Sequence, residues 1–246
     1  MATQKKGEPE VSLWERLDRP AATQRAALTP QKIAAVAVKV ADAEGFAAVT
    51  MRRLATELGV APMAAYRHVS GKDDLWALMV DRVTAETVVP EDLTGWREVL
   101  RAYAVGSRQL MLAHPWLAQL PTPHFALTPN RMAVAERQLA ALERRGLDAD
   151  TAMTAFRTVG AYVHGVSQSE VALRQYMEHN GWTSGDETRQ GLAPQMMYLM
   201  NTGRYPAYQR YALAAGRKDD AAWQFETGLD CVLDGIAVRL GIEEQE

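Results

Sequence analysis

The chain has 246 residues, 48% of them hydrophobic and 23% charged, so it is long enough and apolar enough to bury a large core. This composition excludes a disordered chain, a collagen-like chain and a coiled-coil rod. The 27 Lys and Arg residues against 30 Asp and Glu residues leave a net charge of −3, which does not fit a uniformly basic nucleic-acid-binding protein. Any DNA-binding surface must therefore be local.

The single cysteine, Cys231, excludes an intramolecular disulfide and a zinc cluster built on cysteines. Its apolar surroundings predict a reduced, buried side chain. The first 19 residues alternate charged and apolar side chains, unlike a signal peptide. No stretch approaches the roughly 18 apolar residues that a membrane span needs. We therefore expect a cytoplasmic protein with no membrane partner, no cofactor and no bound metal.

Helical periodicity dominates, and no run of alternating β-branched residues indicates a strand, so the sequence predicts an all-α protein. Residues 1–28 are expected to form an N-terminal arm. An amphipathic piece at residues 13–17 makes it either a tethered arm or a partly ordered extra helix.

Four helices are predicted between residues 29 and 83. Threonine caps begin the first two and glycines end them, at Thr29, Gly45, Thr50 and Gly59. The third helix begins near Pro62 and reaches about His68. Ser70, with Asp73 three residues later, resembles a capping box that starts the fourth helix.

Longer helices are predicted beyond Pro90, at residues 93–113, 128–145, 148–178, 188–201 and 219–241. Thr128 and Asp148 have the side chains and positions expected of N-caps. The segments 114–129 and 180–191 are expected to be irregular, because the first contains four prolines and the second is rich in glycine, hydroxyl groups and charge.

Residues 51–70 have the layout of a helix-turn-helix. Ala55 supplies a small residue where the two helices cross, and Gly59, four residues later, allows a sharp left-handed turn. Between Thr50 and Lys72 there are four basic residues and one acidic residue, a balance of +3. The first 83 residues carry +2 (12 basic, 10 acidic) and the rest −5 (15 basic, 20 acidic). Positive charge thus coincides with the motif, as phosphate contacts require.

The stretch from Thr50 to Val69, TMRRLATELGVAPMAAYRHV, followed by GKDDL, resembles the N-terminal domain of the tetracycline-repressor (TetR) family. The Tyr-x-His-Val extension and Lys72 make this resemblance specific among helix-turn-helix proteins. A weaker resemblance to the family's C-terminal domain lies around Leu112–His114, Ala161–Gly165 and Phe225–Ile236. It implies a three-helix DNA-binding domain over residues 29–75 and a larger helical ligand-binding and dimerisation domain over 76–246.

The resemblance further implies a transcriptional repressor that binds a palindromic operator as a homodimer and is released by a small hydrophobic or aromatic effector. The implied DNA contacts are Thr50, Arg52, Ala61, Pro62, Met63, Ala64, Tyr66, Arg67, His68 and Lys72. The tetracycline repressor has polar side chains where this chain has Pro62, Met63 and Ala64, so apolar contact to thymine methyls and a different operator are expected. Alternatively, Met63, Tyr66 and His68 pack inward.

A ligand cavity is also implied, and its candidate lining residues are Trp96, Tyr103, Met111, His114, Trp116, Phe125, Met132, Tyr162, His164 and Gln168. His114 falls where tetracycline-binding relatives have a metal-ligating histidine. The matching carboxylate falls near Ser169 or Glu170, and the drug-contacting histidine falls near Val88. The metal and drug site is therefore not reproduced, and we expect an effector other than magnesium-tetracycline.

Two long apolar helix faces in the second half predict either a dimer interface, as the resemblance implies, or an ordinary internal core. Their residues are Met153, Phe156, Val159, Gly160, Val163, Phe225, Leu229, Val232, Ile236 and Leu240. Periodicity alone does not separate the two readings.

Two other classes of function remain as alternatives. An enzyme would use His114 and His164, with Glu170, for acid–base chemistry, but the chain lacks a metal-binding histidine pair, a nucleophile elbow and a phosphate loop. A helical small-molecule-binding protein without DNA binding would leave the basic segment as a solvated face. We therefore expect a regulator and no enzyme activity.

Overall fold

The computed structural model describes residues 11–18, 28–120 and 127–242. All regular structure in these residues is helical, which confirms the predicted all-α class. Among the same residues, no helix combines the length and the apolarity that a membrane span requires. The chain forms two compact units: unit 1 is Met1–Val88 with Ala113–Arg137, and unit 2 is Val89–Leu112 with Gln138–Glu246.

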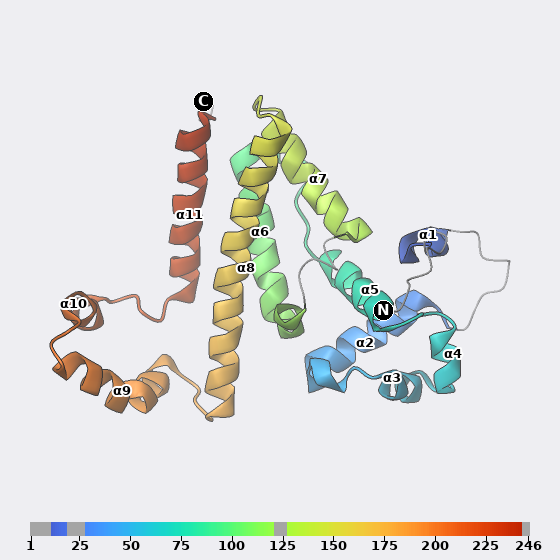
Figure 1. The fold of residues 1–246 in the computed structure, drawn as a ribbon, viewed down its shortest axis with the longest axis horizontal. Coiled ribbons are helices and arrows are strands. Elements are labelled where there is room, and N and C mark those ends of the chain that lie inside the picture. The colour runs from blue at the N-terminus through green and yellow to red at the C-terminus, as the bar shows by residue number, and fades with distance from the viewer. Residues whose placement is uncertain (1–10, 19–27, 121–126, 243–246) are drawn as a thin grey trace, which may run out of the picture. The chain divides into compact units, whose positions relative to one another are not determined.

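Unit 1 contains the predicted helix-turn-helix (Figure 1). Its elements are α1 (Leu13–Asp18), α2 (Pro30–Glu44), η1 (Phe46–Ala48), α3 (Met51–Leu58), α4 (Pro62–Tyr66), α5 (Lys72–Thr84), η2 (Pro115–Gln119) and the first part of α7 (Pro129–Glu143). Helix α5 belongs to this unit because it packs along α2. Leu75 and Met79 of α5 are buried, and so is Ile33 of α2. Unit 1 therefore includes more residues than the predicted DNA-binding segment, 29–75.

The local signals in the sequence act as predicted at the start of α2 and around α3. Thr29 and Thr50 accept hydrogen bonds from the backbone N–H groups of Lys32 and Arg53, both at 3.2 Å. Gly59 has φ +65°, a left-handed conformation that residues with a Cβ rarely adopt. These caps fix where α3 begins and ends.

Two predicted caps are wrong because other carboxylates reach the helix starts. At α5 the N-cap residue is Gly71, and Asp74, not Asp73, accepts from the Ser70 N–H at 3.1 Å. At α7 the backbone N–H of Asn130 donates to Asp81 of α5 at 2.8 Å. The Thr128 hydroxyl is buried and makes no hydrogen bond with the described residues.

Unit 2 is built on three long helices that lie side by side in Figure 1. Its elements are α6 (Trp96–Ala113), the last part of α7, α8 (Ala149–His179), α9 (Gly185–Asn201), α10 (Pro206–Ala214) and α11 (Ala221–Leu240). Arg97 of α6 pairs with Asp234 of α11 at 2.7 Å, and Arg108 of α6 pairs with Glu170 of α8 at 2.8 Å. Ion pairs therefore join α6 to both of its neighbours.

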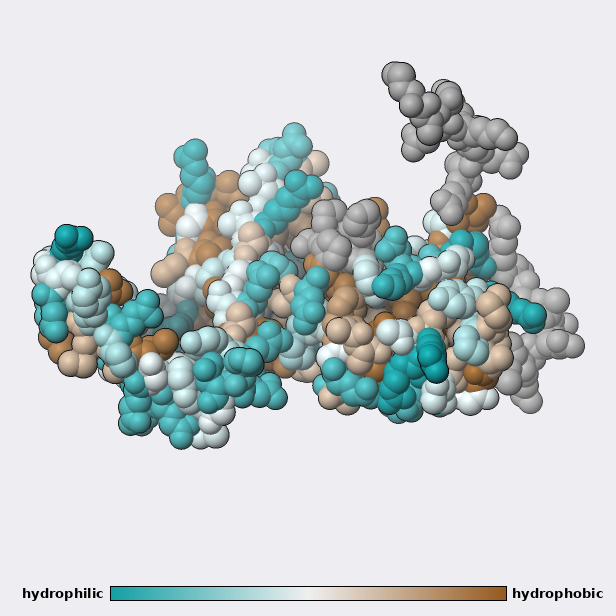
Figure 2. Space-filling model, turned by 60° about the horizontal axis from the view of Figure 1, so that its bottom comes forward, coloured by the Kyte–Doolittle hydropathy of each residue, from teal (hydrophilic) through white to brown (hydrophobic). Residues whose placement is uncertain are grey.

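Helix α10 was not predicted, and its length explains why. None of its residues is buried, and Tyr208, Tyr211 and Leu213 are all exposed. Figure 2 shows hydrophobic residues on the surface at this end of the molecule. Helix α10 has only 9 residues, which is shorter than the stretch over which a helical period can be recognised in a sequence.

Cys231 is exposed, so the predicted burial is wrong. Helix α11 buries the face that carries Leu229, Leu233 and Ile236, and Cys231 lies on another face of the same helix. The apolar composition of the segment therefore did not indicate which face is covered.

Candidate DNA-binding, effector and dimer surfaces

The helix-turn-helix has a buried side and an open side. Leu54, Ala55, Ala65 and Val69 are at most 1% exposed, and the backbone N–H of Val60 donates to the Ala55 carbonyl at 3.0 Å. Small alanines at this contact let α3 and α4 approach closely. The remaining side chains of the two helices are left at the surface.

All ten predicted DNA contacts are accessible to solvent. Ala64 and His68 are half-buried, and the exposed residues are Thr50, Arg52, Ala61, Pro62, Met63, Tyr66, Arg67 and Lys72. Met63 is 70% exposed and Tyr66 48% exposed, so neither packs inward. Hydroxyl, cationic and apolar side chains thus share one accessible surface around α3, α4 and the start of α5.

Neighbouring arginines on α3 have different environments. Arg53 pairs with Glu44 at 2.7 Å and with Glu57, and these carboxylates raise the pKa of its guanidinium. The hydrogen bond from Arg53 in turn lowers the pKa of Glu44. Arg52 is exposed and has no ion-pair partner among the described residues. Arg52 is therefore the arginine of α3 that remains available to DNA.

Helix α1 packs beside the start of α5. Arg16 donates to Asp74 at 2.5 Å, and the Trp14 indole N–H donates to the Leu127 carbonyl at 3.1 Å. This ion pair offsets the negative charge of Asp74, which lies two residues after Lys72 in the sequence. The α1 helix thus favours a more positive potential where Lys72 is exposed.

The ten effector candidates are divided between the units. His114, Trp116 and Met132 belong to unit 1, Phe125 lies outside the described residues, and unit 2 holds Trp96, Tyr103, Met111, Tyr162, His164 and Gln168. Within unit 2, Met111 is buried, Tyr103 and His164 are half-buried, and Gln168 is exposed. Met132 in unit 1 is 50% exposed.

Two of these candidates already have structural partners for their polar atoms. The Trp96 indole N–H donates to the Ile242 carbonyl at 3.1 Å, and the Tyr162 hydroxyl donates to the Phe225 carbonyl at 2.7 Å. Burial raises the pKa of Tyr162, with Cys231 and Glu226 adding to this effect. Both side chains hold α11 in place.

His114 is buried among residues of unit 1. Its Nδ1 lies 2.8 Å from Asp42 and its Nε2 lies 3.3 Å from Glu86. The Trp116 indole N–H also donates to Asp42 at 2.8 Å. Asp42 and Glu86 were not predictable as partners of His114, because no local pattern in the sequence connects them with residue 114.

Glu170 is not available as a free carboxylate. It is largely buried and bonds to Arg108 at 2.8 Å and to Arg174 at 2.7 Å. The Arg108 guanidinium also lies 5.0 Å from the centre of the Phe225 ring. With His114 and Glu170 both paired elsewhere, the residues support neither the tetracycline-type metal pair nor the acid–base alternative.

Five of the predicted dimer residues lie in the interior of unit 2: Val159, Val163, Phe225, Leu229 and Ile236. Val159, Val163, Phe225 and Leu229 pack between helices of one chain and are not available to a partner, so for these four the internal-core alternative holds, whereas Ile236 lines the open groove between α8 and α11. The others, which are half-buried, are Met153, Phe156, Gly160, Val232 and Leu240.

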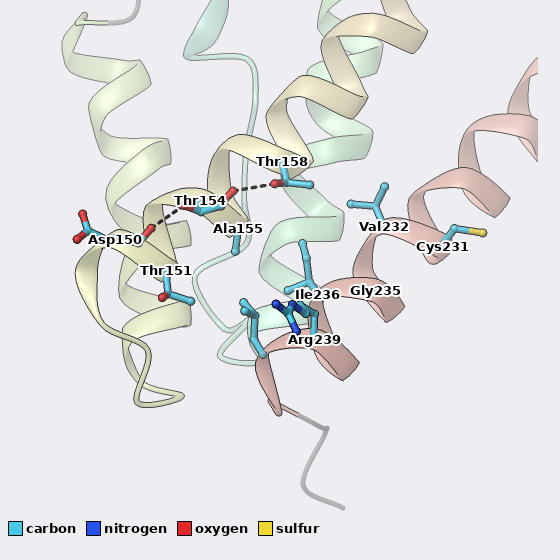
Figure 3. Close-up of a pocket in the computed structure, with 11 residues that line it drawn as sticks. Asp150, Thr151, Thr154, Ala155, Thr158, Cys231, Val232, Gly235, Ile236 and Arg239 are labelled. Carbon is cyan, nitrogen blue, oxygen red and sulfur yellow. Dashed lines mark hydrogen bonds between the residues drawn. The ribbon is translucent and has the colours of Figure 1, made fainter.

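An open groove of about 550 Å³ runs between α8 and α11 (Figure 3). Small residues, among them Ala155 and Gly235, line it together with Thr154, Thr158 and Val232. Both threonine hydroxyls donate to carbonyls of their own helix at 2.8 Å, which leaves their methyl groups for packing. A search of the sequence for apolar helix faces does not predict this groove, because threonines and small residues line much of it. The four-residue spacing of Thr154 and Thr158 along α8 is the sequence feature that indicates it.

The chain combines an accessible, locally basic helix-turn-helix with a second helical unit. This is the architecture of a DNA-binding regulator. Residues 33–79 match the family model of bacterial regulatory proteins of the tetR family, and residues 89–240 match that of the tetracyclin repressor-like C-terminal domain. The chain belongs to the tetR family of transcription regulators. It is therefore a regulator and not an enzyme, as predicted.

Relatives of this chain include a repressor and two proteins of known structure. The HTH-type transcriptional repressor DrrR1 of Streptomyces coeruleorubidus is 33% identical over 231 residues, covering 92% of this chain and 83% of that protein. ActR of Streptomyces coelicolor in complex with actinorhodin is 29% identical with a TM-score of 0.72, covering 89% and 99%. BioQ with its natural double-stranded DNA operator is 25% identical with a TM-score of 0.60, covering 85% and 98%.

Proposed function

We propose that this chain represses transcription in the cytoplasm by binding a palindromic operator as a homodimer, and that a small hydrophobic or aromatic effector releases it. The observation that carries the proposal is the accessible surface of Met63, Tyr66 and Lys72 on a helix-turn-helix segment with a charge of +3. DNA reading is assigned to residues 29–75, and ligand binding and dimerisation to residues 76–246.

At the operator, Thr50, Tyr66 and Lys72 are assigned to phosphates and Arg52 to a base or a phosphate. The structure of BioQ with its operator supports a DNA-bound state for a chain of this fold. Met63 and its neighbours Pro62 and Ala64 would contact thymine methyls in the major groove. Phosphate contacts would supply salt-dependent affinity, and the apolar contacts would supply the choice of sequence.

The dimer is assigned to the open groove between α8 and α11, with a second copy of the chain as its occupant. Thr154, Thr158 and Gly235 are small enough for two helices of the partner to approach closely. The half-buried residues Val232 and Leu240 in the same groove would add apolar contact. A two-fold dimer would present two copies of α4 about one DNA turn apart, roughly 34–36 Å.

The effector is assigned to three unit 2 side chains that form no hydrogen bond or ion pair with the described residues, Tyr103, His164 and Gln168, together with the buried Met111. An aromatic ligand fits a set in which thioether, phenol and imidazole groups occur together. The structure of ActR with actinorhodin supports an aromatic ligand for this fold. Release would follow from tighter binding of the effector to a conformation with low operator affinity.

The DNA-binding proposal is tested with the full chain and a random duplex pool. The chain should select a two-fold symmetric sequence at low salt. Tyr66→Ala with Lys72→Ala should weaken binding by about tenfold or more and reduce the salt slope by roughly one unit per lost phosphate contact. Arg210→Ala, a change at an exposed arginine of α10, is the matched control. Unchanged affinity in the double variant would refute the assigned surface.

The effector proposal is tested with a panel of aromatic natural products that includes actinorhodin. A true effector should release the selected duplex and raise the melting temperature of the free protein, because it binds the folded state. His164→Ala should weaken that release. Release that is indifferent to His164→Ala and to Tyr103→Ala would remove both residues from the assignment.

A further inference from the structure

Ser167 of α8 carries a buried hydroxyl group that has no hydrogen-bond partner among the described residues. The residue is 0% exposed, so solvent at the surface does not reach its oxygen. A buried hydroxyl without a hydrogen bond costs stability, because it loses the bonds that it makes with water in the unfolded chain. A fully buried, unpaired group of this kind indicates a partner outside the protein.

Other hydroxyl groups on α8 bond to their own helix. Ser169 donates to the Gly165 carbonyl at 2.9 Å, and Thr158 donates to the Thr154 carbonyl at 2.8 Å. The carbonyl four residues earlier is a common acceptor for a serine or threonine hydroxyl within a helix. The Ser167 hydroxyl forms no bond of this kind, so it remains free to donate to another molecule.

The ion pair between Arg108 of α6 and Glu170 of α8 lies next to this hydroxyl. Ser167 and Glu170 are three residues apart and therefore share a face of α8. The Nε and Nη2 atoms of Arg108 lie 3.0 Å and 2.8 Å from the same Glu170 oxygen. The Nη1 group of Arg108 has no hydrogen bond with the residues that the structure describes. A second donor is thus available about one helical turn from Ser167.

The charged groups beside Ser167 have a positive balance. Glu170 also pairs with Arg174 at 2.7 Å, so two guanidinium groups share one carboxylate, a balance of +1. Arg174 is mostly exposed, whereas the side chains of Arg108 and Glu170 are only 17% and 10% exposed. A positive charge that is partly withdrawn from water attracts an anion more strongly than one at the surface. The surroundings of Ser167 therefore favour a ligand with an anionic group.

Aromatic side chains lie close to the same polar groups. The Arg108 guanidinium lies 5.0 Å from the centre of the Phe225 ring. The Tyr103 hydroxyl of α6 lies 3.8 Å from the position that a Cβ of Gly160 would take, about two helical turns before Ser167 on α8. All of these residues belong to unit 2. Aromatic surface with a few fixed polar groups is the composition typical of a small-molecule site.

We propose that the effector is an aromatic carboxylic acid whose carboxylate accepts from the Ser167 hydroxyl and is neutralised by Arg108. This inference rests on the function proposed above and names the chemical class of its effector. Ser167 is the residue that selects this class, because an aromatic compound without an acceptor at that point leaves the buried hydroxyl unpaired.

The test uses the full chain without DNA and two matched probes. Rhein is a hydroxylated anthraquinone with a carboxylate, and chrysophanol has the same ring system with a methyl group in its place. Quenching of tryptophan fluorescence should show that the unmodified chain binds rhein about tenfold or more tightly than chrysophanol. Ser167→Ala should weaken binding of rhein by about tenfold and change binding of chrysophanol by less than about twofold.

Stability separates this role from a structural one. Free Ser167→Ala should melt at the same temperature as the unmodified chain or higher, because the substitution removes an unpaired buried hydroxyl. A Ser167→Ala chain that melts at a lower temperature and binds rhein as before contains a merely structural serine, which overturns the proposal. An unmodified chain that does not prefer rhein to chrysophanol overturns it as well.

Glu170→Gln tests the role of charge. It keeps an oxygen that can accept from Arg108 but removes the negative charge, so affinity for rhein should rise by about threefold or more, with no such gain for chrysophanol. A folded Glu170→Gln chain that binds rhein more weakly contradicts the role of Arg108. Melting curves identify variants that fail to fold, and the comparison with Ser167→Ala does not depend on Glu170→Gln.

Ser169→Ala is the matched control. It removes an exposed hydroxyl that already bonds to the Gly165 carbonyl, so rhein should bind as it does to the unmodified chain. If only neutral aromatic compounds release the selected duplex, the proposed function stands and this inference fails. A chain that binds rhein through Ser167 but selects no duplex instead contradicts the proposed function alone.

Discussion

At the scale of single residues, adjacent positions in the sequence take up different tasks because helix geometry points them in different directions. Arg52 and Arg53 are chemically identical, yet only Arg53 lies within reach of Glu44 and Glu57. Residues one position apart on a helix do not share a face. The ion pairs thus hold Arg53 to α2 and α3, and Arg52 stays exposed.

Arg52→Ala and Arg53→Ala should therefore have opposite profiles. Arg52→Ala should weaken binding of the selected duplex by about tenfold with no change in melting temperature, because it removes a DNA contact and no internal one. Arg53→Ala should lower the melting temperature slightly, because exposed ion pairs contribute little stability. Binding titrations and thermal melts of both variants check this. Equal losses of affinity would contradict the distinction.

Gly228 of α11 is required by a close contact with Tyr162. A Cβ at this position would overlap the tyrosine hydroxyl group, which donates to the Phe225 carbonyl. Gly228→Ala should therefore destabilise the fold by about 1–3 kcal/mol through crowding. Gly165→Ala on α8, where no atom lies within 4 Å of the added Cβ, should instead be neutral or stabilise by up to about 1 kcal/mol. Urea unfolding of the two variants measures both changes in the free energy of unfolding.

At the scale of helices and their ends, capping side chains were predictable where they act within a few residues. Thr29, Thr50 and Asp148 each accept from the backbone N–H three residues later. The cap at α7 comes from Asp81, 49 residues before Asn130, and no local pattern signals it. Local caps follow from the sequence, whereas a cap in which the acceptor lies on another helix depends on packing.

Helix α9 begins with a variant of the capping box, in which Glu187 reaches Thr183, the residue before the N-cap Ser184, and this carboxylate makes the helix start sensitive to acid. The Ser184 hydroxyl accepts from the Glu187 N–H at 3.2 Å, and the Glu187 carboxylate accepts from the Thr183 N–H and hydroxyl. These bonds lower the pKa of Glu187 from its ordinary value of 4.5. A lowered pKa in the folded state contributes stability above the unfolded value and loses it as the pH falls.

We therefore expect the first turn of α9 to fray as the pH falls below about 4.5. Hydrogen exchange at residues 185–190, measured between pH 6 and about pH 3 and corrected for intrinsic rates, should show faster opening at low pH. Glu187→Gln should show fast opening at both pH values. A wild-type chain whose corrected opening rate is independent of pH would rule out this role of the carboxylate.

At the scale of the whole molecule, the balance of charge reflects the two tasks proposed for the chain. The total of −3 divides into +2 for the first 83 residues and −5 for the rest. A regulator that carries its positive charge only near the helix-turn-helix gains phosphate attraction there. The acidic remainder does not need to approach DNA.

Dimer formation through the α8–α11 groove is the prediction at this scale. Gly235→Arg places a long cation in a groove lined mainly by small and apolar residues and should convert the protein to a monomer. Operator affinity should fall together with dimerisation, because a monomer presents only one copy of α4. Light scattering after gel filtration and duplex titration measure both effects.

The control for this prediction is Ala133→Arg, which adds the same side chain at an exposed position of α7. It should leave mass and affinity unchanged. A Gly235→Arg protein that remains dimeric would place the interface on another surface. Melting curves confirm that both variants are folded.

Local chemistry in the chain was enough to predict the helical class, the glycine turn of the helix-turn-helix, the threonine caps and the basic segment between Thr50 and Lys72. These features depend on residues a few positions apart, within one or two turns of helix. Two other features are different in kind: the bond of His114 to Asp42, 72 residues away, and the hydrogen bond that Asp81 accepts from the start of α7. So is the choice of which faces of α8 and α11 are covered and which line the groove. These features depend on which helices pack together, because side chains far apart in the sequence meet only when packing brings their helices into contact.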